Sequence, residues 1–234
     1  MSLPAFLPAD LLPLRPKLLT CRAIPFAAPE LRDALGCRAA HTSLGLVTAD
    51  QDDSMYAALD HATKFARVDV VYAKSLYAGA AHASGPLSGE ILGVLAAEDP
   101  DEILEGLAAL RAYLAEFACF YTLPGGSQPA FFPHVIAETG EYLSAAAGIA
   151  RGEPLAYLIA PPTESMVGID AALKAADVRL CRFFGPPTET NYGGAYLTGT
   201  LYAVQAAAAA FAEAISDVAR RPLEAARRAP SERS

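Results

Sequence analysis

The feature that most constrains the fold is an internal repeat, in which the residue order of the first half returns in the second half. Four blocks of matched residues carry it, at spacings that shorten along the chain. Ile24, Leu31, Ala34, Gly36, Leu46 and Val47 match Ile136, Leu143, Ala146, Gly148, Leu158 and Ile159 at 112 residues (136 − 24); Ser54-Met55 matches Ser165-Met166 at 111 (165 − 54); Asp60, Ala62, Lys64, Ala66 and Val68 match Asp170, Ala172, Lys174, Ala176 and Val178 at 110 (170 − 60); Gly89 matches Gly194 at 105 (194 − 89). Loop deletions produce such stepwise shortening. The ordered series predicts two tandem copies of one structural unit.

Each copy has the pattern of a mixed α/β unit. In the first copy we expect strands over 18–26, 44–47 and 89–95, a β-rich stretch from Val68, a short helix over 29–35 that ends at Gly36, a helix capped by Asp53 or Ser54, and a long helix from Asp99. Glycine just past a helix end and proline with acids in a first turn support the helix bounds. The apolar residues of the long helix recur at helical spacing.

The join between the copies falls in a turn-rich segment at 119–128, which contains Pro124-Gly125-Gly126-Ser127. We therefore expect a first domain over 1–118, which opens with a proline-rich lead-in, and a second domain over 119–222. A basic tail at 223–234 follows a helix C-terminus, where cations are favoured without any nucleic acid.

Composition limits the function classes. The 234 residues are 53% hydrophobic and 19% charged, which excludes a disordered chain. A net charge of −8 argues against a surface that tracks nucleic-acid phosphates. The N-terminus has no basic start and is broken by prolines, and the alanine-rich run 202–215 is too short to cross a bilayer. We expect a soluble, cytoplasmic protein that binds neither nucleic acid nor membrane.

Motifs for metal, cofactor or catalysis are missing from the sequence. The cysteines form no CxxC pair, so free thiols are favoured over two disulfides, and the histidines show neither HxxxH nor HExxH spacing; these residues are Cys21, Cys37, Cys119, Cys181, His41, His61, His82 and His134. GxSxG, GxGxxG and P-loop patterns do not occur. We expect no metal, no cofactor and no enzyme.

Four long motifs and one residue pair are similar to the shell proteins of the ethanolamine-utilisation bacterial microcompartment. They are SLGLVTADQDD at 43–53, VVYAKSLYAGAAH at 70–82, the Gly89-Glu90 pair, PLAYLIAPPTESMVGIDAALKAADV at 154–178 and FGPPTETNYGGAYLTG at 184–199. The resemblance implies an α/β (α+β) protein of two tandem, circularly permuted microcompartment domains with ferredoxin-like sheets. It also implies a homotrimeric pseudohexamer that tiles a shell with other shell proteins, with a small pore in each subunit and a central pore that opens and closes.

The resemblance implies a ligand site in the small pore, at the positions where the family binds ethanolamine. Those positions are Asp52, Asp53, Glu90, Phe120, Thr190 and Asn191. The chemistry agrees, because a small ammonium alcohol needs carboxylates for its charge and an aromatic face for its CH₂ groups. On the residues alone, Asp52 and Asp53 are more often helix caps, Glu90 a solvated strand edge, and Asn191 part of a turn.

Two glycine-rich segments at equivalent places, 77–86 and 184–192, are expected to ring the central pore. Their candidate residues are Tyr77, Gly79, His82, Gly185, Glu189 and Tyr192. Glycine permits alternative backbone conformations, so a gate is one interpretation and a pair of rigid turns is the other. The alternative function is a small-molecule-binding regulatory domain or an enzyme that uses Asp52, Asp53 and Glu90.

Overall fold

The computed structural model describes residues 3–76, 85–125, 129–186, 188 and 190–223. The first half runs β2 (Leu18–Ile24), α1 (Pro29–Ala34), β3 (Ser43–Ala49), α2 (Asp52–Phe65), β4 (Asp69–Ser75), β5 (Ile91–Ala97) and α3 (Pro100–Glu116). The second half runs β7 (Phe132–Ile136), α4 (Glu141–Ala147), β8 (Leu155–Ala160), α5 (Pro162–Ala175), β9 (Arg179–Phe184), β10 (Gly193–Thr198) and α6 (Leu201–Arg220). The strand orders are β2-β3-β5-β4 and β7-β8-β10-β9, with antiparallel neighbours throughout. The mixed α/β fold with two copies of one unit is therefore confirmed.

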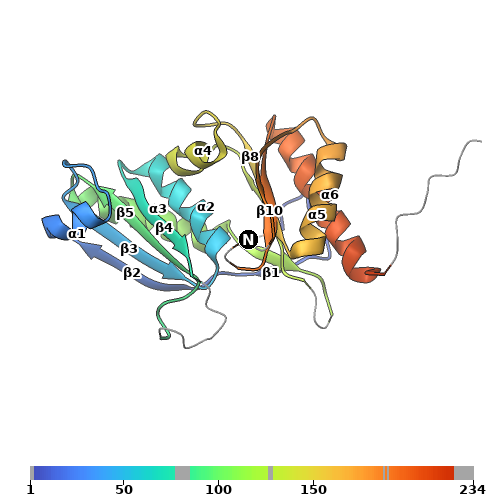
Figure 1. Ribbon diagram of the computed structural model, residues 1–234, viewed down its shortest axis with the longest axis horizontal. Coiled ribbons are helices and arrows are strands. Elements are labelled where there is room, and N and C mark those ends of the chain that lie inside the picture. Colours follow the sequence, from blue (N-terminus) through green and yellow to red (C-terminus); the bar gives the residue numbers. More distant parts are fainter. Residues whose placement is uncertain (1–2, 77–84, 126–128, 187, 189, 224–234) are drawn as a thin grey trace, which may run out of the picture.

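Each sheet has one face covered by helices and one face free of its own helices. α2 and α3 cover the first sheet, and α5 and α6 cover the second. In Figure 1, α2 lies between the two sheets, while α5 and α6 lie on the outer side of the second. The helix-free face of the second sheet joins the same core as α2 through Tyr157, Ile159 and Tyr196. The two halves are thus packed through α2.

The start of α2 differs from the sequence expectation. The helix begins at Asp52, its N-cap is the extended Gln51, and no side chain caps it as Asp53 or Ser54 was expected to do. Instead, the Asp52 carboxylate accepts a hydrogen bond from the Asp53 N–H at 2.8 Å. Both acids therefore stand in the first turn, where the helix dipole favours negative charge.

Other element bounds agree closely with the expectations. Gly36 ends the first short helix with φ +70°, and Asp99 caps α3 by accepting from the Asp101 N–H at 2.8 Å. β5 begins at Ile91, two residues later than expected. Gly89 has φ +62°, and a Cβ there would overlap the Ala49 carbonyl oxygen, so this turn requires glycine.

The structure moves the repeat matches by one or more residues at three places along the chain. Val47 faces the helices of its sheet, whereas Ile159 faces away from α5 and α6 and its neighbour Leu158 faces them. A slip of one residue moves a strand side chain to the other face, so Leu158 is the counterpart of Val47. In the helices, buried Met55 corresponds to buried Ser165, which excludes the match to the exposed Met166.

The match of Gly89 to Gly194 is also wrong, because the two residues do not occupy equivalent positions in the two sheets. Leu95 in β5 and Leu197 in β10 both face the helices of their own sheets and are equivalent residues of the repeat. β5 is therefore the counterpart of β10. Gly89 precedes β5 and has no counterpart in the second sheet. The loop before α5 is one residue shorter than the loop before α2, and the loop before β10 is shorter than the loop before β5, so sequence spacing alone misaligned these residues.

The N-terminal lead-in packs on the second half. Leu7 and Leu11 are buried in the core beneath α6, and β1 (Leu12–Leu14) pairs antiparallel with β6 (Phe120–Thr122). All four cysteines are free, as expected, and Cys119 is buried. Among the described residues, no helix is long and apolar enough to span a bilayer.

Candidate ligand-binding site between the two halves

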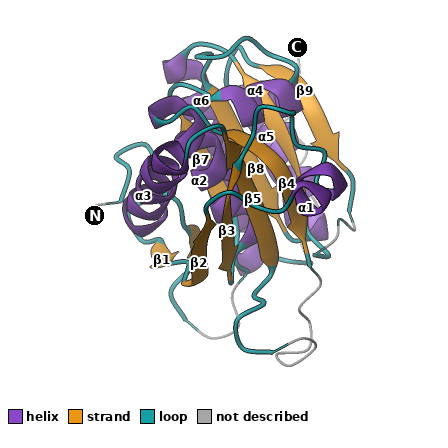
Figure 2. Cartoon of the chain, turned by 90° about the vertical axis from the view of Figure 1, so that its left-hand side faces the viewer, coloured by secondary structure: helices purple, strands orange, loops and turns teal. Residues whose placement is uncertain are grey.

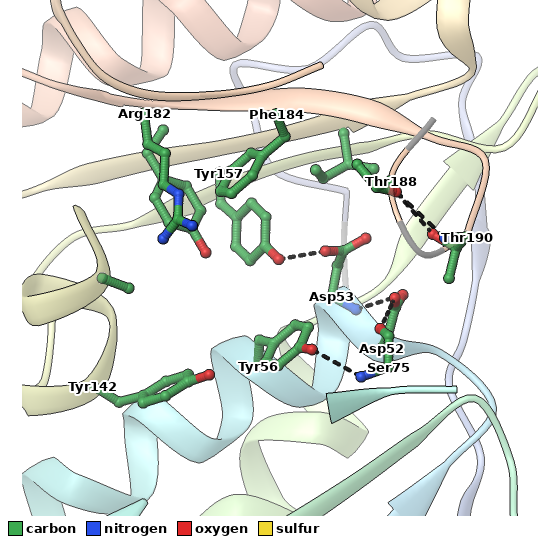
Figure 3. A pocket seen from close by; sticks show the side chains of 13 residues that line it. Asp52, Asp53, Tyr56, Ser75, Tyr142, Tyr157, Arg182, Phe184, Thr188 and Thr190 are labelled. Carbon is green, nitrogen blue, oxygen red and sulfur yellow. Dashed lines mark hydrogen bonds between the residues drawn. The ribbon is translucent and has the colours of Figure 1, made fainter. Parts of the chain in front are cut away.

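A cavity of about 200 Å³ lies where the N-terminus of α2 meets the helix-free face of the second sheet (Figure 3). Its lining comes from both halves of the chain. The lining residues are Asp52, Asp53, Tyr56, Ser75, Tyr142, Ala146, Tyr157, Ile159, Arg182, Phe184, Thr188, Thr190 and Tyr196. The cavity therefore exists only because the two copies of the repeat are packed together.

A smaller cavity of about 130 Å³ adjoins the first. It is lined by Leu14, Gln51, Asp52, Glu90, Phe120, Ala130, Thr190 and Tyr192. Asp52 and Thr190 line both cavities. The structure thus brings four of the expected ligand residues to the smaller cavity and places the fifth, Asp53, at the larger one.

The two aspartates in the first turn of α2 are buried and hydrogen-bonded. The Tyr157 hydroxyl donates to the Asp53 carboxylate, and the Ser75 hydroxyl donates to the Asp52 carboxylate. Tyr157 comes from β8 and Ser75 from the end of β4, so each half supplies one of these donors. The hydrogen bonds hold both carboxylates in fixed positions at the cavity walls.

Electrostatics in this cluster favour a cation. Burial, followed by the negative charge of Asp52, raises the pKa of Asp53 well above its usual value, although the Tyr157 hydrogen bond acts in the opposite direction. Burial and the charges of Asp52 and Asp50 also raise the pKa of Glu90. Neighbouring acids raise one another's pKa values, because two negative charges repel. A positive charge that binds among them stabilises their ionised forms.

Aromatic side chains form one wall of the smaller cavity. Phe120 is buried and meets the Tyr192 ring edge-on, with ring centroids 6.0 Å apart. Burial and then the charge of Glu90 raise the pKa of Tyr192, so its hydroxyl stays neutral beside the acids. A face of this kind suits the methylene groups of a small organic cation.

The turn at 188–192 contributes one of its two expected residues. Its Thr188 N–H donates to the Tyr192 carbonyl at 2.9 Å, which directs Thr190 toward both cavities. Asn191 is exposed, has φ +64° and lines neither cavity. Its position fits the turn interpretation, in which asparagine tolerates positive φ.

Sequence reasoning missed several lining residues, namely Tyr56, Ser75, Tyr142, Tyr157 and Arg182. Tyr157 carried a signal, because it stands in the middle of the strand Leu155–Ala160, which is buried throughout. A buried tyrosine hydroxyl needs a hydrogen-bond partner, so a polar group was to be expected opposite it. The other four carry no signal until the two halves are brought together.

The expected central-pore residues are mostly outside the described part of the chain, which omits Tyr77, Gly79, His82 and Glu189. Gly185 is exposed on the loop after β9, and Tyr192 lines the smaller cavity. Within the described ranges no three histidine, cysteine or acidic side chains are grouped as a metal site would require.

Comparisons with known proteins agree with this architecture. No family model matches the chain. The microcompartment shell protein EutL of Clostridium perfringens is 50% identical over 210 residues, which cover 90% of this chain and 97% of that protein. The crystal structure of EutL from Leptotrichia buccalis is 49% identical, with a TM-score of 0.88, and covers 91% of this chain and 98% of the other. The trimeric shell protein PduB, at 20% identity and a TM-score of 0.72, covers 87% of this chain and 89% of its own; it shares the fold alone.

The fold is thus that of the tandem-domain shell proteins of bacterial microcompartments. Identity near one half over nine-tenths of the chain narrows the assignment: the chain belongs to the EutL family of shell proteins. It is a structural component of a microcompartment shell and not an enzyme. The alternative interpretation of the acids as catalytic groups is therefore set aside.

Proposed function

We propose that three copies of the chain form a pseudohexameric shell tile, and that each subunit binds ethanolamine or a similar ammonium alcohol between its halves. One observation supports the ligand most directly. Asp52, Asp53 and Glu90 meet at adjoining cavities, and two of their pKa values are raised by burial and mutual repulsion. A bound cation relieves that repulsion.

In this site the ammonium group lies between Asp52 and Glu90, both of which line the smaller cavity. The methylene groups contact Phe120 and Tyr192, and the Thr190 hydroxyl is available to the alcohol. A cavity of about 130 Å³ admits only a ligand of few heavy atoms. We expect weak binding, with Kd about 10⁻³ to 10⁻⁴ M, because so small a ligand makes few contacts.

Titration calorimetry with ethanolamine tests the site. Glu90→Gln and Asp52→Asn should each weaken binding about tenfold or more, because each removes a charge that pairs with the ammonium. Glu105→Gln, at an exposed position of α3, is the matched control. We expect one site per chain, since the start of α5 carries Pro162 and Thr163 instead of two aspartates. Unchanged binding in both site variants would place the ligand elsewhere.

The trimer follows from the repeat, because three chains of two similar halves place six units around one axis. We assign the units to 1–118, whose N-terminal lead-in packs on the second half, and 119–222, followed by the basic tail 223–234. The partners at the outer edges of the tile are other shell proteins, and the location is the microcompartment shell. Sedimentation equilibrium at micromolar concentration checks the trimer, and a stable monomer would contradict it.

The central pore is the second element of the proposal. The loops 77–86 and 184–192 follow equivalent strands, β4 and β9, and in a threefold arrangement both would lie around the axis. Because Thr190 and Tyr192 belong to the second loop and line the ligand cavity, occupancy there biases the conformation of that loop. Structures of the trimer with and without ethanolamine test the gate. One unchanged loop conformation in both would leave a rigid pore.

A further inference from the structure

The larger cavity carries charges of opposite sign on its two sides. Asp52 and Asp53 lie on the side of α2, and Arg182 lies on β9 of the second sheet. The smaller cavity adds the carboxyl of Glu90. The proposed ammonium site uses only the acidic side, so binding of an ammonium alcohol gives the guanidinium of Arg182 no role.

The register of the second sheet fixes the position of Arg182. Arg182 pairs with Tyr196 across β9 and β10, and Tyr196 pairs with Tyr157 across β10 and β8. Directly paired residues of antiparallel strands point to the same face, so these three side chains form one row across the helix-free face. Neighbouring strands lie about 4.8 Å apart, so the backbones at the two ends of the row are separated by about 10 Å. Because the Tyr157 hydroxyl donates to Asp53, the acid lies at one end of the row and Arg182 at the other (Figure 3).

Aromatic rings form the wall between these two charges. The Tyr196 ring meets the rings of Tyr157 and Phe184 edge-on, with ring centroids 4.7 and 4.8 Å apart. The guanidinium carbon of Arg182 lies 5.1 Å from the centre of the Phe184 ring. Burial raises the pKa values of Tyr157 and Tyr196, so both hydroxyls stay neutral. A ligand that extends from the acids to the guanidinium would therefore contact apolar ring surface along its middle.

The equivalent row of the first sheet has no cation. In the alignment that matches β5 with β10, this row consists of Tyr72, Val94 and Leu46, which pair across β4, β5 and β3. Viewed from the α1 end, the strands of the first sheet lie toward the viewer (Figure 2). All three residues belong to an apolar cluster or pack against it. The row is thus polar only in the sheet that faces the acids of α2.

Each of the edge strands β4 and β9 carries a cation over an aromatic ring, but in opposite order. In β4 the ring comes first, and the Lys74 ammonium lies 5.5 Å from the centre of the Tyr72 ring. In β9 the cation comes first, at Arg182, and Phe184 follows it. Lys74 lines neither cavity, whereas Arg182 lines the larger one. The reversed order therefore puts a guanidinium on the cavity wall.

We propose that Arg182 forms a second subsite, which binds the carboxylate of a ligand whose ammonium group lies between Asp52 and Glu90. The ligand class is an ω-amino acid, a zwitterion with its two charges at the ends of a short chain. The planar guanidinium matches a carboxylate in geometry. A carboxylate carries a single negative charge, so it adds less repulsion than a phosphate dianion beside these acids. The inference rests on the proposed ammonium site and extends the ligand that it takes.

The positions of the two charges exclude an α-amino acid from this class. The ammonium site lies in the smaller cavity, Arg182 lines only the larger one, and Asp52 and Thr190 line both. In an α-amino acid both charged groups are attached to the same carbon, so they cannot lie in different cavities. The methylene chain of γ-aminobutyrate extends from one cavity into the other, and the flexible side chain of Arg182 closes the remaining distance.

Ligand-observed NMR titration with γ-aminobutyrate and γ-aminobutyramide tests the subsite. The amide keeps the ammonium group and the chain length but lacks the negative charge. The wild-type protein should bind γ-aminobutyrate about threefold to fivefold more tightly than the amide, a modest factor because the Arg182 side chain is exposed. Equal affinities for the two compounds would overturn the subsite.

Three variants locate this preference for the carboxylate. Arg182→Gln should abolish it, and Arg182→Lys should keep part of it, because lysine retains the charge without the planar fork. Lys74→Gln is the matched control, since it removes an exposed edge-strand cation over an aromatic ring, and it should leave the preference unchanged. Both affinities are measured on each variant, so a general loss of structure lowers both and does not imitate the effect. A preference that persists in Arg182→Gln, or that Lys74→Gln removes equally, would overturn the role of Arg182.

Ethanolamine separates this inference from the proposed function. If ethanolamine binds to the wild type and γ-aminobutyrate binds no better than its amide, the ammonium site stands and the carboxylate subsite is wrong. If neither ethanolamine nor either longer amine binds, both fail. Glu90→Gln should weaken the binding of all three compounds, because each places its ammonium group at the same acids.

Discussion

The acid that α2 and α5 share, Asp60 in one and Asp170 in the other, has opposite surroundings in the two helices. Asp60 is 1% exposed and accepts two backbone hydrogen bonds from the second half. Asp170 is exposed and forms an ion pair with Lys174 at 2.6 Å, four residues along the same helix. The role of this aspartate is therefore decided by what packs against the side of its helix that faces away from the sheet.

A substitution at these two aspartates gives the largest expected difference. Asp60→Ala leaves the N–H groups of Gly140 and Leu143 buried without partners, which should lower the free energy of unfolding by about 2–4 kcal/mol. Asp170→Ala removes only an exposed ion pair and should change it by less than about 0.5 kcal/mol.

Urea unfolding measures both values, at one fixed protein concentration so that subunit contacts contribute equally to each. Equal losses at the two positions would show that the surroundings of the two aspartates do not differ in their effect on stability. A loss at Asp170 alone would reverse the comparison.

The glycine at the start of α4 gives the next largest effect. Gly140→Ala places a Cβ against the Asp60 carbonyl oxygen, so α2 and α4 must move apart, at a cost of about 1–3 kcal/mol. Ala28→Gly, at the counterpart position before α1, should stay within about 0.5 kcal/mol because Ala28 is exposed. Thermal unfolding compares the pair, and a tolerated Gly140→Ala would mean that the halves are less tightly packed than described.

The pH dependence of ligand binding follows from the acids, which only the α2 end carries. Since burial raises the pKa of Glu90 above its ordinary 4.5, the carboxylate is protonated at a higher pH than a surface glutamate. A cationic ligand needs the ionised form, so its affinity should fall as pH decreases through this raised pKa. Binding should also release protons, because the ligand lowers the pKa of the acids around it.

Calorimetry in two buffers of different ionisation enthalpy measures that proton release between pH 5 and pH 8. In Glu90→Gln the release should be smaller. A wild-type affinity that stays constant as pH is lowered below the ordinary glutamate pKa of 4.5 would contradict a site built on these acids.

The smallest expected effect is on stability at Asp53. Its pKa is higher in the folded chain than in the unfolded chain, so the folded state holds the proton more tightly. The stabilisation from that proton is complete below the unfolded pKa and is lost as pH rises through the folded pKa. Asp53→Asn keeps an oxygen for the Tyr157 hydroxyl and avoids this loss, so the melting temperature of the variant relative to wild type should rise between pH 5 and pH 8.

The exposed Glu105→Gln should show no such trend in its melting temperature, and it serves as the control. A relative melting temperature of Asp53→Asn that falls with pH would mean that the ionised carboxylate is stabilised in the fold.

Much of the chain organisation could be read without coordinates. The repeat, the order of helices and strands, and Gly36 and Asp99 at helix ends all rest on patterns in the sequence itself. Local patterns suffice there because helix caps and strand alternation depend on neighbouring residues. The resemblance to shell proteins, carried by long motifs, supplied the expected fold and ligand chemistry.

The tertiary structure alone decided the alignment of the two copies and the surroundings of their shared residues. A shift of one residue in a strand is almost invisible in sequence, yet it turns Ile159 away from the helices that Leu158 contacts. Tyr157 meets Asp53 across 104 positions, and Asp60 meets Leu143 across 83. Such contacts depend on how the two halves pack against each other, and the sequence of one half does not specify which residues of the other half it contacts.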